Sequence, residues 1–203
     1  MALQLPTGNA PIAMKQIRPA DIGVGLTGLA AAAVSIWAVP GAGGFLGAGL
    51  ALLMLAIAIV DLRHMIIPDA LSAAALALAI VNAGMADMAS IVDGIATAVL
   101  RGSLTMLVFL ALRAAYAWLR QREGIGLGDV KLAFVAGAWL DGVMIPVAVE
   151  IAALAALMAY VTWHLVAKQP LNATSRLPFG LFFAPAIWLS WLLGEVIIGP
   201  LLL

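Results

Sequence analysis

The sequence predicts an all-α fold, a polytopic bundle of about seven transmembrane helices with its N-terminus in the cytoplasm. Hydrophobic residues make up 65% of the 203 residues and charged residues 10%, whereas a soluble domain is about half apolar and a quarter charged. Several apolar runs approach the roughly 20 residues that a helix needs to cross a bilayer. Many of the 20 glycines and 10 prolines stand between these runs, as expected for short turns at a membrane surface.

The first apolar stretch predicts a helical hairpin. Residues 22–60 carry no charge and are numerous enough for two spans. Pro40 and Gly41 interrupt the middle of the stretch, where a helix would break. We therefore expect one helix near 22–39 and a second near 44–61.

Three further helices are expected near 69–84, 92–119 and 180–199. Pro68 and Asp69 open the first of them, because proline is tolerated at the start of a helix and an acidic residue suits its first turn. The other two are identified by their apolar content and length.

The intervening residues, 129–167, fit either one very long helix or two helices joined by a turn at Asp141 and Gly142. Lys and Arg near helix ends accumulate on the cytoplasmic side of a membrane, and this rule decides between the alternatives. Two helices here, and hence seven in all, place on that side Lys15, Arg18, Arg63, Arg113, Arg120, Arg122, Lys131, Lys168 and Arg176. The sequence therefore favours the turn.

The N-terminal segment, residues 1–20, has no apolar run long enough for a secretory signal, and we expect a cytoplasmic lead-in. Residues 21–203 are expected to form a single membrane-embedded domain. The absence of cysteine excludes disulfides, thiolate zinc sites and cysteine nucleophiles. One basic residue, Arg101, falls inside a span, and we expect it either to snorkel to the interface or to be paired within the bundle, with Asp93 as the candidate partner.

Two aspartates are the candidate functional residues. Asp61 closes the second expected helix and Asp129 opens the fifth. An ionisable group that faces a membrane bundle is a site candidate by default, because its burial is costly. The expected topology places both aspartates at the cytoplasmic interface, where two carboxylates can share a proton and activate a water, one as general base and one as general acid.

Helix dipoles give a hypothesis about their roles. A helix N-terminus favours the ionised form of Asp129, and a helix C-terminus favours the protonated form of Asp61. Asp129 is then the base and Asp61 the proton donor, unless the neighbouring charges of Arg63 and Lys131 reverse the order.

Glycines alternate immediately before Asp129, at Gly124, Gly126 and Gly128. They allow unusual φ values and close approach of the backbone. The structural alternative is a flexible loop followed by Asp129 as a helix cap, and chemistry alone leaves this alternative open. A zinc peptidase is not indicated, because the sequence has two histidines, far apart, and no HExxH motif.

Three segments carry a family resemblance: DLRHMIIPD at 61–69, GIGLGDVKLAFVAGAWL at 124–140 and LPFGLFFAPA at 177–186. In this order they resemble the first aspartate motif, the GxGD stretch and the late PFGPFLA element of the type IV prepilin peptidase family, which are membrane aspartic proteases. The family usually has proline at Leu181 and glycine at Asp141, and these departures concern substrate contacts rather than the aspartates.

The resemblance implies an endopeptidase of the bacterial cytoplasmic membrane. Such an enzyme removes the short basic leader of a pilin-like precursor at the cytoplasmic face, just before the precursor's hydrophobic helix. Asp61 and Asp129 match the family's catalytic aspartates. Supporting or substrate-binding roles are expected for Gly126, Gly128, Lys131, Arg63, Pro178 and Gly180. The expected partners are the precursor and the lipid bilayer, with no cofactor, metal or nucleic acid.

Other members of that family carry a cytoplasmic insertion with paired CxxC motifs and also methylate the new N-terminus. Without cysteine, this chain resembles the short peptidase-only form of Tad pilus systems, and no methyltransferase activity is expected. A proton-coupled transporter or channel is the alternative, because intramembrane acids also suit ion paths. A catalytically inactive assembly protein is a third possibility. Acids at one interface rather than at the midplane favour the peptidase.

Overall fold

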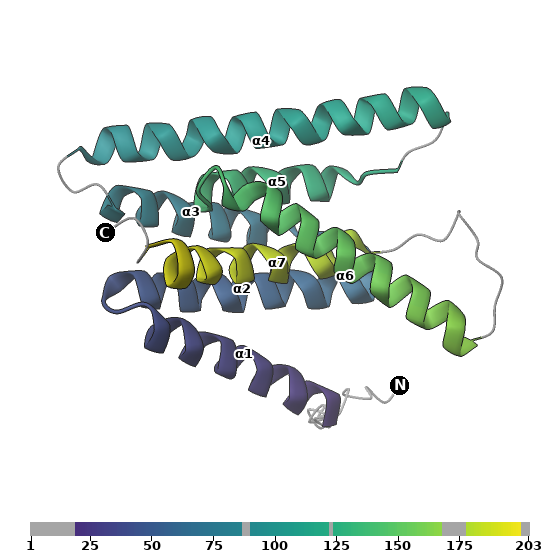
Figure 1. The fold of residues 1–203 in the computed structure, drawn as a ribbon, viewed down its shortest axis with the longest axis horizontal. Helices are drawn as coiled ribbons and strands as arrows, with labels where there is room; N and C mark the ends of the chain where they lie inside the picture. Colours follow the sequence, from purple (N-terminus) through teal and green to yellow (C-terminus); the bar gives the residue numbers. More distant parts are fainter. Residues whose placement is uncertain (1–18, 87–89, 122–123, 168–177, 200–203) are drawn as a thin grey trace, which may run out of the picture.

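A computed structural model describes residues 19–86, 90–121, 124–167 and 178–199. These residues form seven α-helices and a terminal π-helical turn, arranged as one bundle (Figure 1). The elements are α1 (Pro19–Ala38), α2 (Ala42–His64), α3 (Asp69–Ala86), α4 (Ile91–Arg120), α5 (Leu127–Trp139), α6 (Met144–Ala167), α7 (Phe179–Leu193) and η1 (Gly194–Ile198). The expected helical bundle is therefore confirmed, whereas the expected lead-in, residues 1–20, lies almost wholly outside the described residues.

Five of the helices are long and apolar enough to cross a membrane, namely α2, α3, α4, α6 and α7, the last continued into η1. The described apolar part of α1 is shorter. Helix α5 has 13 residues, which at 1.5 Å per residue extend about 20 Å and fall short of the hydrocarbon thickness. The protein is a multi-pass membrane protein in which one short helix lies among longer ones.

The short helix α5 lies in the core. Most of its side chains are buried, and it packs against α4, α3 and α7. Gly137 shows how closely α4 approaches: a Cβ added there would lie 2.7 Å from the carbonyl oxygen of Arg101 and 2.4 Å from the Oγ1 of Thr105. Small residues permit such close helix packing where both surfaces are apolar and the hydrophobic effect does not drive association.

The turn favoured by the basic residues is confirmed. Helix α5 ends at Trp139, and α6 begins at Met144. Between them the amide of Leu140 still bonds to Ala136, whereas the amide of Met144 bonds to Asp141 in a new turn. Among the other expected boundaries, α1 begins three residues early, α2 continues three residues past Asp61, and α7 ends at Leu193, where η1 takes over.

The expected partner of Arg101 is wrong. Its guanidinium lies 2.9 Å from the carboxylate of Asp141, in the turn before α6, while Asp93 accepts a hydrogen bond from the hydroxyl of Ser90. Spacing along α4 favoured Asp93, but the packing of α5 against α4 brings the α5–α6 turn within reach. Arg101 therefore fastens this turn to α4.

One end of the bundle gathers the elements that carry the candidate residues. Helices α2 and α4 end there, and α3, α5 and α7 begin there (Figure 1, right-hand side). Hydrogen bonds and ion pairs described below join these termini to one another. The orientation of this end toward the cytoplasm stays a prediction from the basic residues.

Candidate active site

Asp61 is a buried acid in the last turn of α2. Its side chain is 5% exposed, and the helix continues to His64 before Met65 takes a left-handed conformation and donates its amide to the carbonyl of Asp61. The carboxylate oxygen Oδ2 accepts a hydrogen bond of 3.0 Å from the amide of Leu181, in the first turn of α7. Two helices far apart in sequence therefore meet at this carboxylate.

Gly180 makes this contact possible. A Cβ added to Gly180 would lie 2.8 Å from Oδ2 of Asp61 and 2.9 Å from Cδ1 of Ile67, distances that real Cβ contacts do not show. Pro178 is the residue immediately before α7. A supporting or substrate-binding role was expected for Gly180, and the structure brings this residue into contact with the first candidate aspartate.

Asp129 lies in the first turn of α5. Its Oδ2 accepts a hydrogen bond of 3.2 Å from the amide of Gly126, the residue that precedes the helix. This interaction is half of a capping box, so Asp129 does cap its helix, as the structural alternative expected. Capping uses one carboxylate oxygen, which leaves the other available for chemistry.

The two aspartates interact electrostatically. Asp129 lies in a helix too short to span the membrane, and burial raises its pKa from the ordinary value of 3.8 to about 6. The amide of Gly126 acts in the opposite direction on this pKa, and the negative charge of Asp61 adds to the increase. The structure therefore brings Asp61 and Asp129 into one site although 68 positions separate them.

Ile67 connects the two halves of the site, and it belongs to the first aspartate motif at 61–69. It is buried and precedes the Pro68 and Asp69 that open α3. A Cβ added to Gly128 would lie 3.0 Å from its Cβ, and one added to Gly180 would lie 2.9 Å from its Cδ1. One side chain thus packs against the start of α5 and the start of α7.

The helix-dipole hypothesis for the roles of the two aspartates did not take α7 into account. Asp61 does lie near the C-terminus of α2, but its carboxylate faces the N-terminus of α7 through the amide of Leu181. Asp129 faces the N-terminus of its own helix. Because both carboxylates accept an N-terminal amide, the dipoles do not distinguish a base from a proton donor.

The glycines before Asp129 serve close approach rather than unusual φ values. Among the described glycines, only Gly41 has a positive φ. A Cβ added to Gly124 would lie 2.3 Å from the ring of Tyr116, near the end of α4. Of the two reasons expected from the sequence, the φ argument is therefore wrong and the packing argument is supported.

Arg113 is a further residue that the sequence did not single out. It lies on α4 one turn before Tyr116, and its Nη1 donates a hydrogen bond to the carbonyl oxygen of Ile125. The next residue, Gly126, donates its amide to Asp129. The end of α4 therefore fixes the loop that orients Asp129. Arg113 and Tyr116 stand three residues apart and hence on one face of α4, and this spacing is the sequence pattern that could have indicated the contact.

Lys131 and Arg63 each stand two positions after one of the aspartates. The Nζ of Lys131 lies 2.5 Å from Oδ1 of Asp69, and this exposed pair ties α5 to the start of α3. Arg63 is exposed in the last turn of α2, two positions from Asp61 and hence on another face of the helix. Among the described residues, no three His, Asp or Glu side chains are placed to hold a metal ion.

Two acidic residues at one end of a helical membrane bundle, Asp61 buried and Asp129 partly exposed, define a membrane protein with a candidate carboxylate site. Comparison with known proteins identifies its family. The type IV leader peptidase family matches residues 48–161, and the chain belongs to this family. The matched segment contains both Asp61 and Asp129.

Similar proteins are prepilin leader peptidase/N-methyltransferases. That of Aeromonas hydrophila is 29% identical over 172 residues, which cover 85% of this chain and 57% of the relative. That of Dichelobacter nodosus is 30% identical over 148 residues, which cover 71% and 47%. The chain thus spans about half the length of the relatives it matches. No solved structure matches the chain.

Proposed function

We propose that this protein is an aspartic endopeptidase that removes the basic leader of pilin-like precursors at the cytoplasmic face of the bacterial inner membrane. The observation that carries the proposal is that the end of α2, with Asp61, and the start of α5, with Asp129, lie at one end of the bundle and are linked through Ile67, which packs against Gly128 and Gly180. Membership of the type IV leader peptidase family supports it. The names of the relatives also include an N-methyltransferase activity. For this chain we predict neither that activity nor a cofactor.

The proposed chemistry needs one proton on the carboxylate pair. The ionised carboxylate removes a proton from a water molecule, whose oxygen attacks the carbonyl carbon of the scissile peptide bond. The protonated carboxylate gives its proton to the leaving nitrogen as the carbon–nitrogen bond breaks. The leader departs with a new carboxyl group and the mature protein with a new amine. Because the two groups interact, they titrate as a pair.

The surrounding contacts keep the carboxylates in place. The amide of Leu181 holds Asp61 and that of Gly126 holds Asp129. Gly128 and Gly180 let the starts of α5 and α7 approach Ile67 and Asp61. Such fixed orientation matters because a displacement of about 1 Å in an active site can cost about 100-fold in rate.

The substrate follows from the charge distribution. A basic leader stays on the cytoplasmic side of the membrane while the apolar helix behind it enters the bilayer, so the bond between them lies at the depth of a site at the helix ends. Arg63 and Pro178 lie at the same end and are proposed to line the path of the peptide. Assignment to a Tad-type system rests on the absence of cysteine and is a prediction.

A proton-coupled transporter is the competing function. Asp61 and Asp129 lie at helix ends rather than at mid-span. Because transporters bind their substrates and ions near the middle of the membrane, this position favours the peptidase. Co-expression with a pilin-like precursor separates the two functions, because leader removal changes the mobility of the precursor on a gel. We expect cleavage by the native protein and none by Asp61→Asn or Asp129→Asn at equal membrane levels. Cleavage by either variant would contradict the aspartic mechanism.

A further inference from the structure

A cavity of about 270 Å³ lies between α3, α4 and α5, next to the proposed active site. We call it the α3–α5 groove. It is lined by Asp69, Ser72, Ala73, Leu76, Met106, Lys131, Phe134 and Val135. Lys131 stands two positions after Asp129 on α5, and Asp69 stands two positions after Ile67. The groove therefore begins within one helical turn of the residues that surround the carboxylate pair.

The groove changes from polar to apolar with distance from the site. Helices α3 and α5 both begin at the active-site end of the bundle (Figure 1), and the ion pair between Lys131 and Asp69 joins their first turns. Further along, the lining residues are Leu76 of α3, Met106 of α4 and Phe134 of α5. An occupant must therefore be polar where it meets the site and apolar along the rest of its length.

Ser72 adds a hydrogen-bonding group to this wall. The residue is 7% exposed, and its hydroxyl oxygen has no hydrogen-bond partner among the described residues. Leaving a buried hydroxyl without a partner is unfavourable, so an added hydrogen-bond donor stabilises it. The neighbouring Ala73 is small and exposed, which permits close approach of another helix.

We propose that the α3–α5 groove receives the first turn of the substrate's apolar helix. The inference rests on the proposed function, because that helix begins just after the bond that is cut. The first amides of any helix lack intrahelical partners and carry partial positive charge. The carboxylate of Asp69 and the hydroxyl of Ser72 are acceptors at the polar end of the groove, and the apolar side chains of the substrate then lie along Leu76 and Phe134.

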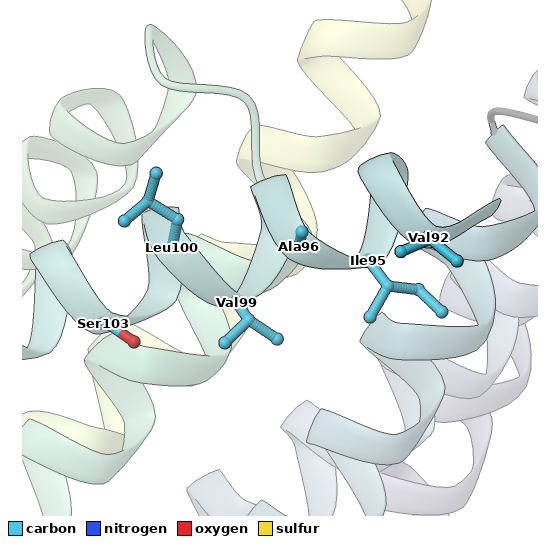
Figure 2. Close-up of a pocket in the computed structure, with 6 residues that line it drawn as sticks. All are labelled: Val92, Ile95, Ala96, Val99, Leu100 and Ser103. Atoms are coloured by element: carbon cyan, nitrogen blue, oxygen red, sulfur yellow. The ribbon is translucent and has the colours of Figure 1, made fainter. Parts of the chain in front are cut away.

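A second cavity shows what distinguishes the groove. It has a volume of about 560 Å³ and is lined by residues of α4 alone, from Val92 to Ser103 (Figure 2). These residues are mostly apolar and belong to the half of α4 that begins at the opposite end of the bundle. None of its described lining residues is charged or lies at the end of the bundle that carries the aspartates.

The absence of cysteine gives a direct test by cross-linking. Ala73→Cys is introduced into the Asp129→Asn protein, which holds the substrate uncleaved, and is paired with a precursor carrying one cysteine in the first turn of its apolar helix. The matched control is Ala159→Cys, an exposed alanine of α6. We expect oxidation to link the precursor to Ala73→Cys at least about tenfold more than to Ala159→Cys. Equal linkage, or none to Ala73→Cys, would overturn the inference.

Kinetics provide a second test with both aspartates intact. Ala73→Trp fills the groove and is expected to raise KM at least about tenfold with kcat little changed, while Ser72→Ala raises KM by a smaller factor. Unchanged KM values would mean that lipid occupies the groove and would overturn the inference while leaving the proposed function intact. Failure of the native protein to cleave the precursor at all would instead contradict the proposed function.

Discussion

Asp61 and Asp129 are each held by a backbone amide that the fold, rather than the adjacent side chains, supplies. The amide of Leu181 comes from α7, 120 positions away from Asp61, and the amide of Gly126 comes from the loop before α5. Lys131, two positions after Asp129, pairs with Asp69 instead. At the scale of single residues, backbone placement is therefore the main determinant of the site.

The raised pKa of Asp129 predicts a pH dependence with a definite sign. The active pair holds one proton, and the pKa of Asp129, about 6, is raised partly by the charge of Asp61, as for the second proton lost by a coupled pair. We expect the cleavage rate to fall as pH rises above this value. A rate that increases steadily from pH 5 to pH 8 in purified enzyme would contradict this assignment.

The same shift predicts an effect on stability. A carboxyl group whose pKa is raised by folding stabilises the protein below its unfolded pKa, and this stability is lost as pH rises through the folded pKa. Asp129→Asn removes the cost of burying the charge, so at pH 7 the inactive variant should melt no lower than the native protein in detergent. A clearly lower melting temperature would show that Asp129 serves mainly as a structural cap.

Gly180 predicts a loss of activity without loss of either aspartate. In Gly180→Ala the new methyl group would lie 2.8 Å from the carboxylate of Asp61 and would push it away from the amide of Leu181. We expect kcat to fall about 100-fold, the cost of a displacement of about 1 Å. Gly142→Ala is the control, because an added Cβ there meets no atom within 4 Å. Equal activities for the two variants would contradict this role of Gly180.

At the scale of elements, the end of α4 acts on the loop before α5. Arg113 bonds to the carbonyl of Ile125 and Tyr116 packs against Gly124, so the loop is fixed from a helix that carries neither aspartate. This explains the glycine at position 124: the loop lies too close to Tyr116 of α4 to carry a side chain there.

Arg113→Ala should therefore change the pH profile as well as the rate. Loosening the loop weakens the bond from Gly126 to Asp129, and this bond lowers the pKa of Asp129. We expect the alkaline limit of activity to move to higher pH and kcat to fall about tenfold, with partial recovery in Arg113→Lys. Arg120→Ala, in the last turn of the same helix, is the control. A lower rate with an unchanged pH limit would indicate only a folding defect.

The helices themselves are largely predictable from the sequence, and the contacts between them are not. Apolar runs and breakers such as Pro40 and Gly41 are local signals, so the expected boundaries lie within a few residues of the observed ones. The partner of Arg101 and the bond from Leu181 to Asp61 depend on packing between distant segments. Motifs identified both aspartates as candidates and included Ile67, but no local pattern indicated that Ile67 packs between the starts of α5 and α7.

At the scale of the whole molecule, the topology predicts which end of the bundle faces the cytoplasm. Single cysteines test it because the chain has none of its own. Leu119→Cys, exposed near the end of α4, is expected to be protected from a membrane-impermeant maleimide in intact spheroplasts, while Gly142→Cys is labelled. Permeabilised cells should label both. The reverse pattern would place the aspartates at the outer face, away from a basic leader.

The most direct test of the paired mechanism is the cleavage rate of purified Asp61→Asn, Asp129→Asn and the double variant on one precursor. Groups that act as a unit are strongly non-additive, because losing either removes the function of both. We predict that the three residual rates are equal within error and close to the uncatalysed rate. Substantial cleavage by one single variant, or a double variant slower by the product of the two single effects, would show that the aspartates do not act together.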